Sequence, residues 1–365
     1  MSEASYSLAA LARYFLKLGT IGFGGPVALV GYMYRDLVET RRWIGEDDYK
    51  EGLTLAQLMP GPLAAQLAMY LGYVHYRIVG ATVAGIAFVL RMKAVGEALG
   101  KPGASMPGGV YRVSLPRSDL KVTLDGVEIK PALALGSWLA FRKMGNPGMV
   151  MGDLVLLTNE VTPVLTKLEE AGIEITALHN HLLRNEPFTM YMHVLGHGDP
   201  VKLATALHAA LAESKTPFEA ATAASPASAQ SIDLDTAAID KALAHHGKIS
   251  GGVYQFSIPR AERISEDGMD VPESMGSANA INFQPTGAGK AAITGDFVLT
   301  ATEVNPVAKA FRAHGIEVTA IHNHMLNDQP RLFFLHFWAN DEVSKLADGL
   351  KAALANMNLE KRSPS

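Results

Sequence analysis

The chain has 365 residues, a formal net charge of −4 at pH 7 and a mean hydropathy of +0.12. This length is sufficient for two or three domains with apolar cores. With 32 Lys and Arg against 36 Asp and Glu, the chain lacks the basic excess typical of nucleic-acid-binding proteins, so we expect no nucleic-acid partner. Because it contains no Cys, thiolate metal sites are excluded, and any metal must be bound by nitrogen and oxygen ligands.

The first 90 residues are the most apolar part of the chain. Three stretches carry no charge, residues 18–34, 52–74 and 78–90. A bilayer requires about 20 apolar residues, so the second stretch is long enough, the first is marginal and the third is too short. The charged residues 35–51 between the first two predict a loop. We therefore expect a membrane-associated α-helical N-terminal segment.

Glycine and proline interrupt two of these stretches, in the motifs GFGGP and PGP. In a membrane such breaks free backbone N–H groups at a half-helix N-terminus, where they can bind an oxyanion. The candidate ion-path residues are Gly22, Gly24, Gly25, Pro26, Pro60, Gly61 and Pro62. The alternative is that both motifs are ordinary turns between helices.

Residues 15–90 closely resemble the start of the chromate ion transporter family, through FLKLGTIGFGGPVALVGYMYRDLVETRRWI and LTLAQLMPGPLAAQLAMYLGYVHYRIVGATVAGIAFVL. The resemblance implies a protein of the bacterial inner membrane that transports chromate or a similar oxyanion. Only the opening of one transporter half is present. Transport would therefore require a homo-oligomer that completes the set of helices.

The remainder of the chain is a tandem duplication with an offset of 143 residues. The offset relates ITALHNHLL at residues 175–183 to VTAIHNHML at residues 318–326, and it also relates the two GGVY motifs. We expect a membrane segment at 1–90, repeats at 91–213 and 232–355, a linker at 214–231 and a tail at 356–365.

Each repeat is predicted to be α+β, with a mostly antiparallel sheet and two helices. The patterns predict strands at 110–115, 121–129, 137–142, 149–157, 173–183 and 188–195, and helices at 162–171 and 199–213.

Three histidines recur in both repeats: His179, His181 and His193, then His322, His324 and His336. Residues two apart on a strand face the same side, and the third histidine follows on the returning strand, near the second. Three such imidazoles suit a divalent metal such as zinc or iron and leave a position for water.

The alternative is that these are core histidines with ordinary hydrogen bonds. Leu178 became Ile321 between the repeats, whereas all three histidines persisted, which favours a polar or metal site. Glu160 and Glu303 are candidates for a fourth ligand, a partner of an imidazole N–H, or a catalytic general base.

Four other recurring residues are given structural roles. For Asp153 and Asp296, which follow glycine, we favour turns. For Arg117 and Arg260 we favour ion pairs at the surface or at a helix end.

The GGVY, GD, NEV and HNH motifs, each present twice, resemble the LppY/LpqO family over about residues 91–355. That resemblance implies a duplicated architecture and no reaction, so whether the chain is an enzyme stays open. One hypothesis is a membrane protein of the chromate ion transporter type that carries a histidine module. A second is a metal-binding protein or metal-dependent enzyme with residues 1–90 as an anchor or fusion remnant, and a third is a protein-interaction domain.

Overall fold

The computed structural model describes residues 6–21, 30–58, 63–142, 148–219 and 231–360. The chain divides into two compact units. Unit 1 comprises Met1–Val113, Phe141–Met149 and His197–Thr205, and unit 2 comprises Ser114–Ala140, Val150–Gly196 and Ala206–Ser365.

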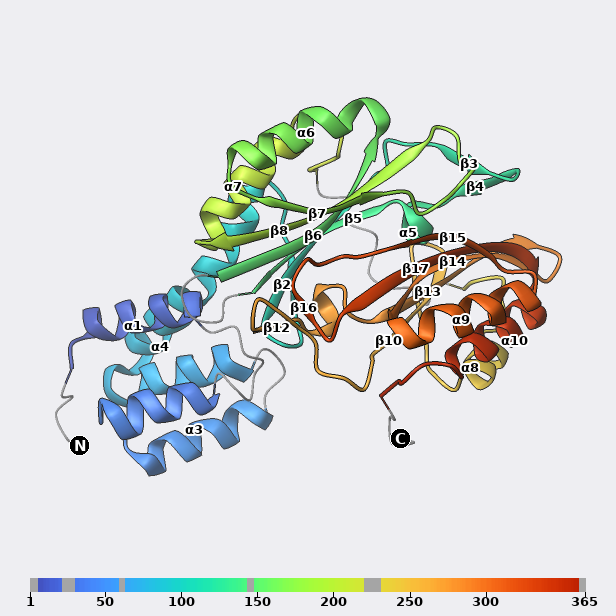
Figure 1. The fold of residues 1–365 in the computed structure, drawn as a ribbon. Helices are drawn as coiled ribbons and strands as arrows, with labels where there is room; N and C mark the ends of the chain where they lie inside the picture. Colours follow the sequence, from blue (N-terminus) through green and yellow to red (C-terminus); the bar gives the residue numbers. More distant parts are fainter. Residues whose placement is uncertain (1–5, 22–29, 59–62, 143–147, 220–230, 361–365) are drawn as a thin grey trace. The chain divides into compact units, whose positions relative to one another are not determined.

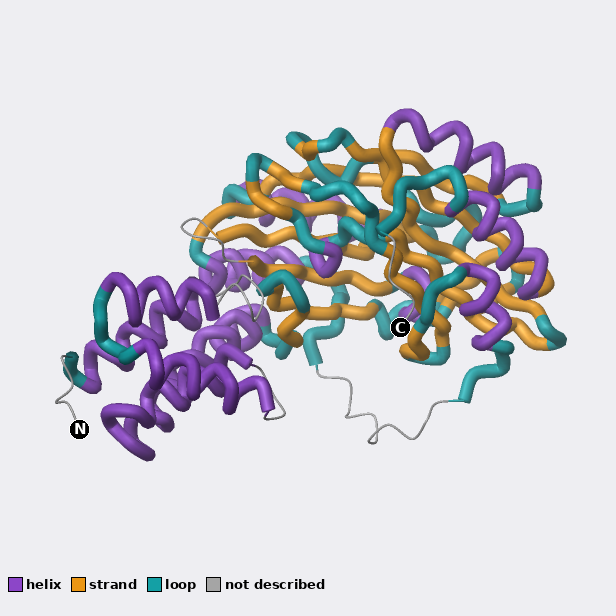
Figure 2. The backbone as a smooth tube through the Cα atoms, turned by 90° about the horizontal axis from the view of Figure 1, so that it is seen from below, coloured by secondary structure: helices purple, strands orange, loops and turns teal. Residues whose placement is uncertain are grey.

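The N-terminal part of unit 1 is helical (Figures 1 and 2). Its elements are α1 (Leu8–Ile21), the π-helix η1 (Tyr34–Thr40), α3 (Glu46–Leu58) and α4 (Leu63–Leu99). Helix α4 is kinked at Arg77, where φ is 52° and ψ is −142°. A Cβ atom on Gly72 would lie 2.2 Å from the carbonyl oxygen of Gly80, so this close approach requires glycine.

The predicted membrane-associated helical segment is wrong for the part of the chain that the structure describes. None of the helices there is both long enough and apolar enough to cross a bilayer. The predicted loop at 35–51 is also wrong, because η1 and α3 occupy most of it. Acidic residues in the first turn of α3, Glu46, Asp47 and Asp48, favour the helix there by interacting with its dipole. All seven candidate ion-path residues lie outside the described residues.

Each repeat contributes one six-stranded sheet. The first has the order β1-β2-β5-β6-β8-β7 and the second β9-β10-β13-β14-β17-β15, so equivalent strands occupy equivalent places and the predicted duplication is confirmed. The first-repeat strands are β1 (Ala104–Met106), β2 (Val110–Pro116), β5 (Gly136–Arg142), β6 (Gly148–Leu157), β7 (Glu174–His179) and β8 (Thr189–Gly198). Those of the second repeat are β9 (Lys248–Ser250), β10 (Val253–Ile258), β13 (Asn279–Gly287), β14 (Lys290–Thr300), β15 (Glu317–His322) and β17 (Leu332–Glu342).

Helices cover the outer face of the second sheet (Figure 1). These are α8 (Thr236–Leu243), α9 (Ala301–Ala313) and α10 (Val343–Leu354), and the first repeat has α6 (Thr158–Glu170) and α7 (Pro200–Leu211). Along β17, Leu335 and Phe337 join the core beneath α9 and α10. Because strand side chains alternate, His336 and Trp338 face the other side of the sheet.

That other side is the junction between the repeats, within unit 2. One buried cluster there combines Val155 and Tyr191 of the first repeat with Val253, Ala292 and Trp338 of the second. The hairpin of β3 (Val122–Leu124) and β4 (Val127–Ile129) and the short helix α5 (Pro131–Ala134) contribute to it as well. The two sheets are therefore joined by a shared core, and their inner faces are where polar side chains would be isolated from water.

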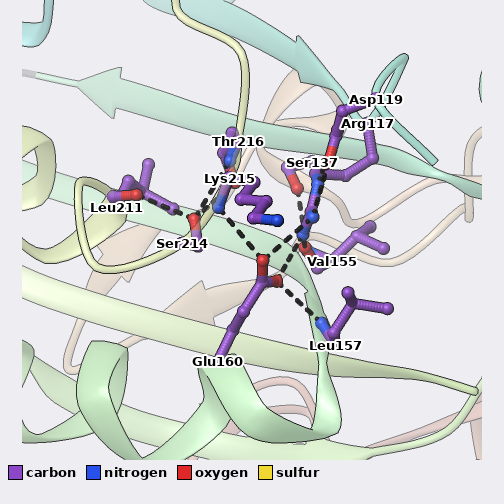
Figure 3. A network of polar contacts seen from close by, with 10 residues as sticks. All are labelled: Arg117, Asp119, Ser137, Val155, Leu157, Glu160, Leu211, Ser214, Lys215 and Thr216. Atoms are coloured by element: carbon purple, nitrogen blue, oxygen red, sulfur yellow. Dashed lines mark hydrogen bonds and ion pairs between the residues drawn. The ribbon is translucent and has the colours of Figure 1, made fainter.

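A buried arginine fixes the start of α6 in the first repeat (Figure 3). All five N–H groups of Arg117 donate: two to Asp119, two to Glu160 and one to the carbonyl of Val155. The Glu160 carboxylate also accepts from the backbone N–H groups of Leu157 and Lys215. These bonds tie β2, β6, α6 and residue 215 together, and they confirm the predicted helix-end ion pair, although Arg117 is buried rather than at the surface.

The second repeat reproduces this network bond for bond. Arg260 donates to Glu262, Glu303 and the carbonyl of Val298, and Glu303 accepts from the backbone N–H of Thr300. Asn358 takes the place of Lys215 in donating its N–H to Glu303. The first residues of the predicted tail are therefore bound to the second repeat.

Replacing Arg117 with Met is expected to lower the free energy of unfolding by about 3–5 kcal/mol, because it leaves the buried Glu160 carboxylate without its counter-charge. Chemical denaturation measures this loss. The control is Lys167→Met, which removes the exposed pair with Glu170 and should cost no more than about 0.5 kcal/mol. Equal effects of the two substitutions would contradict the role given to the buried pair.

The same network predicts a pH dependence of stability. Burial alone would raise the pKa of Glu160, but hydrogen bonds from Arg117 and from two backbone N–H groups outweigh it and lower the pKa below its usual value. The stabilisation is therefore present above the unfolded-state pKa of about 4.3 and is lost as the pH falls through the lower folded-state pKa. The stability gap between wild type and Glu160→Gln should be widest above about pH 5.5 and shrink toward pH 3, and a gap that stays constant would refute this account.

Candidate metal centre

The six recurring histidines of the two repeats form one cluster inside unit 2. The rings of His179 and His322 stack with their centroids 3.4 Å apart. His181 stacks on His336 and His193 on His324, with 3.7 Å between centroids in each pair. Every one of these pairs joins one repeat to the other, so the histidines of both repeats form one cluster.

The cluster has approximate two-fold symmetry. The offset of 143 residues turns the His181–His336 pair into the His324–His193 pair and maps the His179–His322 pair onto itself. The outer faces of two rings are also covered equivalently, His181 by Tyr191 and His324 by Phe334, at 3.4 Å between centroids. The pair His179–His322 therefore lies on the approximate axis.

One aspartate from each repeat completes the cluster. The Nε2 atoms of His181 and His193 lie 3.8 and 3.9 Å from the Asp153 carboxylate oxygens. Those of His324 and His336 lie 3.2 and 3.9 Å from Asp296. Three sets have ligand atoms within 4.8 Å of one another: His179, His181, His322, His336; Asp296, His322, His324, His336; and Asp153, His181, His193.

These aspartates were expected in turns, and that prediction is wrong. Asp153 and Asp296 lie inside β6 and β14, and Asp296 is the direct cross-strand partner of His336. The glycine before each is required by packing, since a Cβ atom on Gly295 would lie 2.1 Å from the Ala280 carbonyl oxygen. The signal in the sequence was the recurrence of Gly-Asp in both repeats, which was interpreted as a turn.

Hydrogen bonds orient several rings so that Nε2 faces the interior of the cluster. The Nδ1 atom of His336 lies 2.9 Å from the Gly295 carbonyl oxygen, and that of His322 lies 3.0 Å from the Asn323 carbonyl oxygen. Because a carbonyl only accepts, Nδ1 carries the proton and Nε2 keeps its lone pair. His193 likewise has a hydrogen bond to the backbone of Gly152.

The inward-facing atoms are buried and lack hydrogen-bond partners in the described part of the chain. They are Nε2 of all six histidines, Nδ1 of His179 and Oδ1 of Asp296. Buried polar atoms in folded proteins almost always have a partner, so this many orphans in one place indicate a ligand.

Burial also keeps the imidazoles neutral. It lowers the pKa of each of the six histidines below the ordinary value, that of His336 to about 3 although Asp296 acts in the opposite direction. Burial raises the pKa of Asp296, with His336 and His322 opposing it. Neutral imidazoles are the metal-binding form, and a carboxylate in this environment gains from a nearby cation.

The edge strands β7 and β15 hold the two halves in register by reciprocal hydrogen bonds. Thr176 Oγ1 donates to the His324 carbonyl and Thr319 Oγ1 to the His181 carbonyl. Asn180 and Asn323 donate in the same reciprocal way to the carbonyls of Thr319 and Thr176. Sequence reasoning missed these four residues, although the threonine three residues before the HNH motif and the asparagine within it recur in both repeats.

The local geometry differs in detail from the sequence prediction. Strand β7 ends at His179, so His181 lies beyond it in a bend, and the register partner of His193 is Ala177. Neither Glu160 nor Glu303 belongs to any of the three ligand sets among the described residues, and both carboxylates bind arginine. Their predicted metal or catalytic role stays a prediction.

Residues 93–213 and 237–356, together well over half of the chain, match a family model described as Domain of Unknown Function (DUF1259). The chain belongs to this family. Residues 9–93 match the model described as Chromate transporter. The expected combination of a chromate-transporter-like start with a duplicated family domain is therefore confirmed.

Two curated relatives are named for chromate transport. A "Chromate transport protein" of Cupriavidus metallidurans is 74% identical over 86 residues, which is 24% of this chain and 21% of that protein. A "Probable chromate transport protein" of Synechococcus elongatus is 64% identical over 169 residues, 46% of this chain and 41% of that one. The chain thus spans between a fifth and two fifths of the length of these relatives.

A solved structure, that of the trimeric bacterial microcompartment shell protein PduB, aligns with 72% of this chain and 97% of its own. The identity is 11% and the TM-score is 0.20, and no structural argument follows from a score this low.

Proposed function

We propose that the two DUF1259 repeats together form one binding centre for two divalent cations of the zinc or iron type. The observation that carries the proposal is the convergence of six imidazole Nε2 atoms, buried and without hydrogen-bond partners, beside two aspartates. Core histidines with an ordinary structural role would be hydrogen-bonded through both ring nitrogens or replaced by apolar residues.

The number of donors favours two cations over one. Eight side chains converge, whereas a first-row divalent ion takes about four to six ligands. Asp296, His322, His324 and His336 form a four-ligand set for one cation. Asp153, His181 and His193 form a three-ligand set for the other, and His179 lies between the two.

The distances within each set fit a shared ion. Two ligand atoms that are each about 2.1 Å from a metal lie roughly 3.0–3.4 Å from each other in octahedral or tetrahedral geometry. The Asp–His separations of 3.2–3.9 Å are close to this range. Three of the four exceed hydrogen-bond distance, so an ion accounts for the arrangement better than direct bonds do.

The ligand types favour zinc or iron over calcium or magnesium, because imidazole nitrogen outnumbers carboxylate oxygen. A cation held by only three protein ligands keeps a position for water or substrate and can act on it as a Lewis acid. The ligand types support a metal-binding protein. The remaining coordination position is what a metal-dependent enzyme would use.

Purified full-length protein, loaded with zinc and dialysed, is expected to contain about two zinc ions per chain. Elemental mass spectrometry measures this content. His324→Ala should remove at least one of them, because it deletes a ligand from the four-ligand set. The control is His246→Ala, which changes an exposed histidine outside the cluster and should retain both ions.

Thermal unfolding provides an independent measurement of the same binding. A ligand at about 100 times its Kd stabilises by about 2.7 kcal/mol, so chelator treatment should lower the Tm of the wild type and have less effect on His324→Ala. A folded wild-type protein without metal after loading would exclude the proposal and favour structural histidines.

A second candidate function is supported by the 74% identity of the N-terminal part to a chromate transport protein. In this proposal residues 9–93 take part in the transport of chromate or a similar oxyanion at the bacterial inner membrane. The matched part is 21% of the length of that relative.

Expression of the full chain in a chromate-sensitive bacterium is then expected to lower cellular chromate relative to an empty vector. The matched variant is Gly24→Val with Gly25→Val, which alters the FGGP motif and should abolish the effect. Fractionation of the same cells locates the protein. Recovery of all of it in the soluble fraction, or equal chromate in cells with and without it, would reject this candidate.

A further inference from the structure

The charge of the loaded centre is not balanced by the protein. The three ligand sets contain two carboxylates, those of Asp153 and Asp296, and otherwise neutral imidazoles. Two divalent cations would therefore leave a net charge of about +2 in a largely buried position. A buried charge of this size is costly unless a counter-charge is close.

Several other carboxylates of unit 2 already have partners. Asp125 and Glu317, the latter at the start of β15, both bind Arg184, at 3.0 and 2.7 Å. Asp328, which follows the HNH motif of the second repeat, binds Arg331 at 2.8 Å. Arginine compensates these three carboxylates, so they do not supply the missing negative charge, whereas an exogenous anion can supply it.

Some ligand side chains of the centre are partly exposed. The side chains of His193, His324 and His336 are 2–6% exposed, whereas that of Asp296 is 20% exposed and that of His181 14%. His179 and His322, on the approximate axis, are also only partly buried. The centre is therefore close to the protein surface at these residues, although the Nε2 atoms of its histidines are buried.

We infer that the doubly loaded centre binds a tetrahedral, doubly charged oxyanion of the phosphate, sulfate or chromate type, shared between the two cations. The inference rests on the proposed two-cation function and specifies what that site takes. Two cations about 3.5–4 Å apart can each bind one oxygen of such an anion, as in two-metal phosphatase centres. A dianion matches the net charge, whereas a monoanion such as nitrate leaves half of it uncompensated.

The experiment uses the full chain loaded with zinc, with metal content measured first. Isothermal titration with inorganic phosphate is expected to show one site per chain, and chelator-treated protein should bind at least tenfold more weakly. Nitrate at the same ionic strength should give no comparable binding. Titrations with sulfate and with chromate, and competition of each against phosphate, establish which oxyanion is preferred.

A matched variant separates this site from a general anion-binding surface. Lys290 lines a polar surface cavity together with Glu128 and Asn340, outside the histidine cluster. Lys290→Gln should leave phosphate binding unchanged. Loss of binding in that variant, or equal binding with and without zinc, would overturn the inference.

The outcomes distinguish the two proposals. Protein that takes up no zinc eliminates the two-cation function and the oxyanion inference together. Protein that holds two zinc ions but does not bind phosphate, sulfate or chromate overturns the oxyanion inference alone, and hydroxide ions then balance the charge.

Discussion

The reciprocal contact between the edge strands β7 and β15 is the constraint on which the centre depends. Thr176 and Thr319 each donate to the carbonyl of a histidine in the other repeat, and Asn180 and Asn323 return the contact. This register brings His179 against His322. The first repeat alone supplies a set of three donors and the second a set of four, whereas the two together supply eight converging donors.

The residues that stabilise the fold are distinct from those of the histidine cluster. Strand alternation and two buried arginines account for this separation. On β17, Leu335 and Phe337 pack beneath helices while His336 faces the cluster. Arg117 and Arg260 take up the carboxylates of Glu160 and Glu303, which fixes the first turns of α6 and α9. The sheets are thereby anchored from their outer sides, so their inner faces can carry polar groups that contribute little to stability.

The similarities of the two parts of the chain to known proteins rest on different evidence. Family membership and the observed duplication rest on the larger part, where sheet order is the same in both repeats. The N-terminal part has high identity to a chromate transport protein over a short length, and its described helices lack a bilayer-spanning member. A shared chemistry of oxyanions would give the fusion of these parts a physical rationale.

By itself the sequence determined the duplication, the antiparallel α+β character of the repeats, and the recurrence of three histidines, because these follow from local periodicity and an offset of 143 residues. It could not determine that His181 stacks on His336, that Asp153 and Asp296 face the histidines from inside strands, or that Glu160 is bound by Arg117. Those facts depend on which inner faces meet and in what register. Contacts between residues about 150 positions apart are decided by tertiary packing, and local sequence patterns carry no information about them.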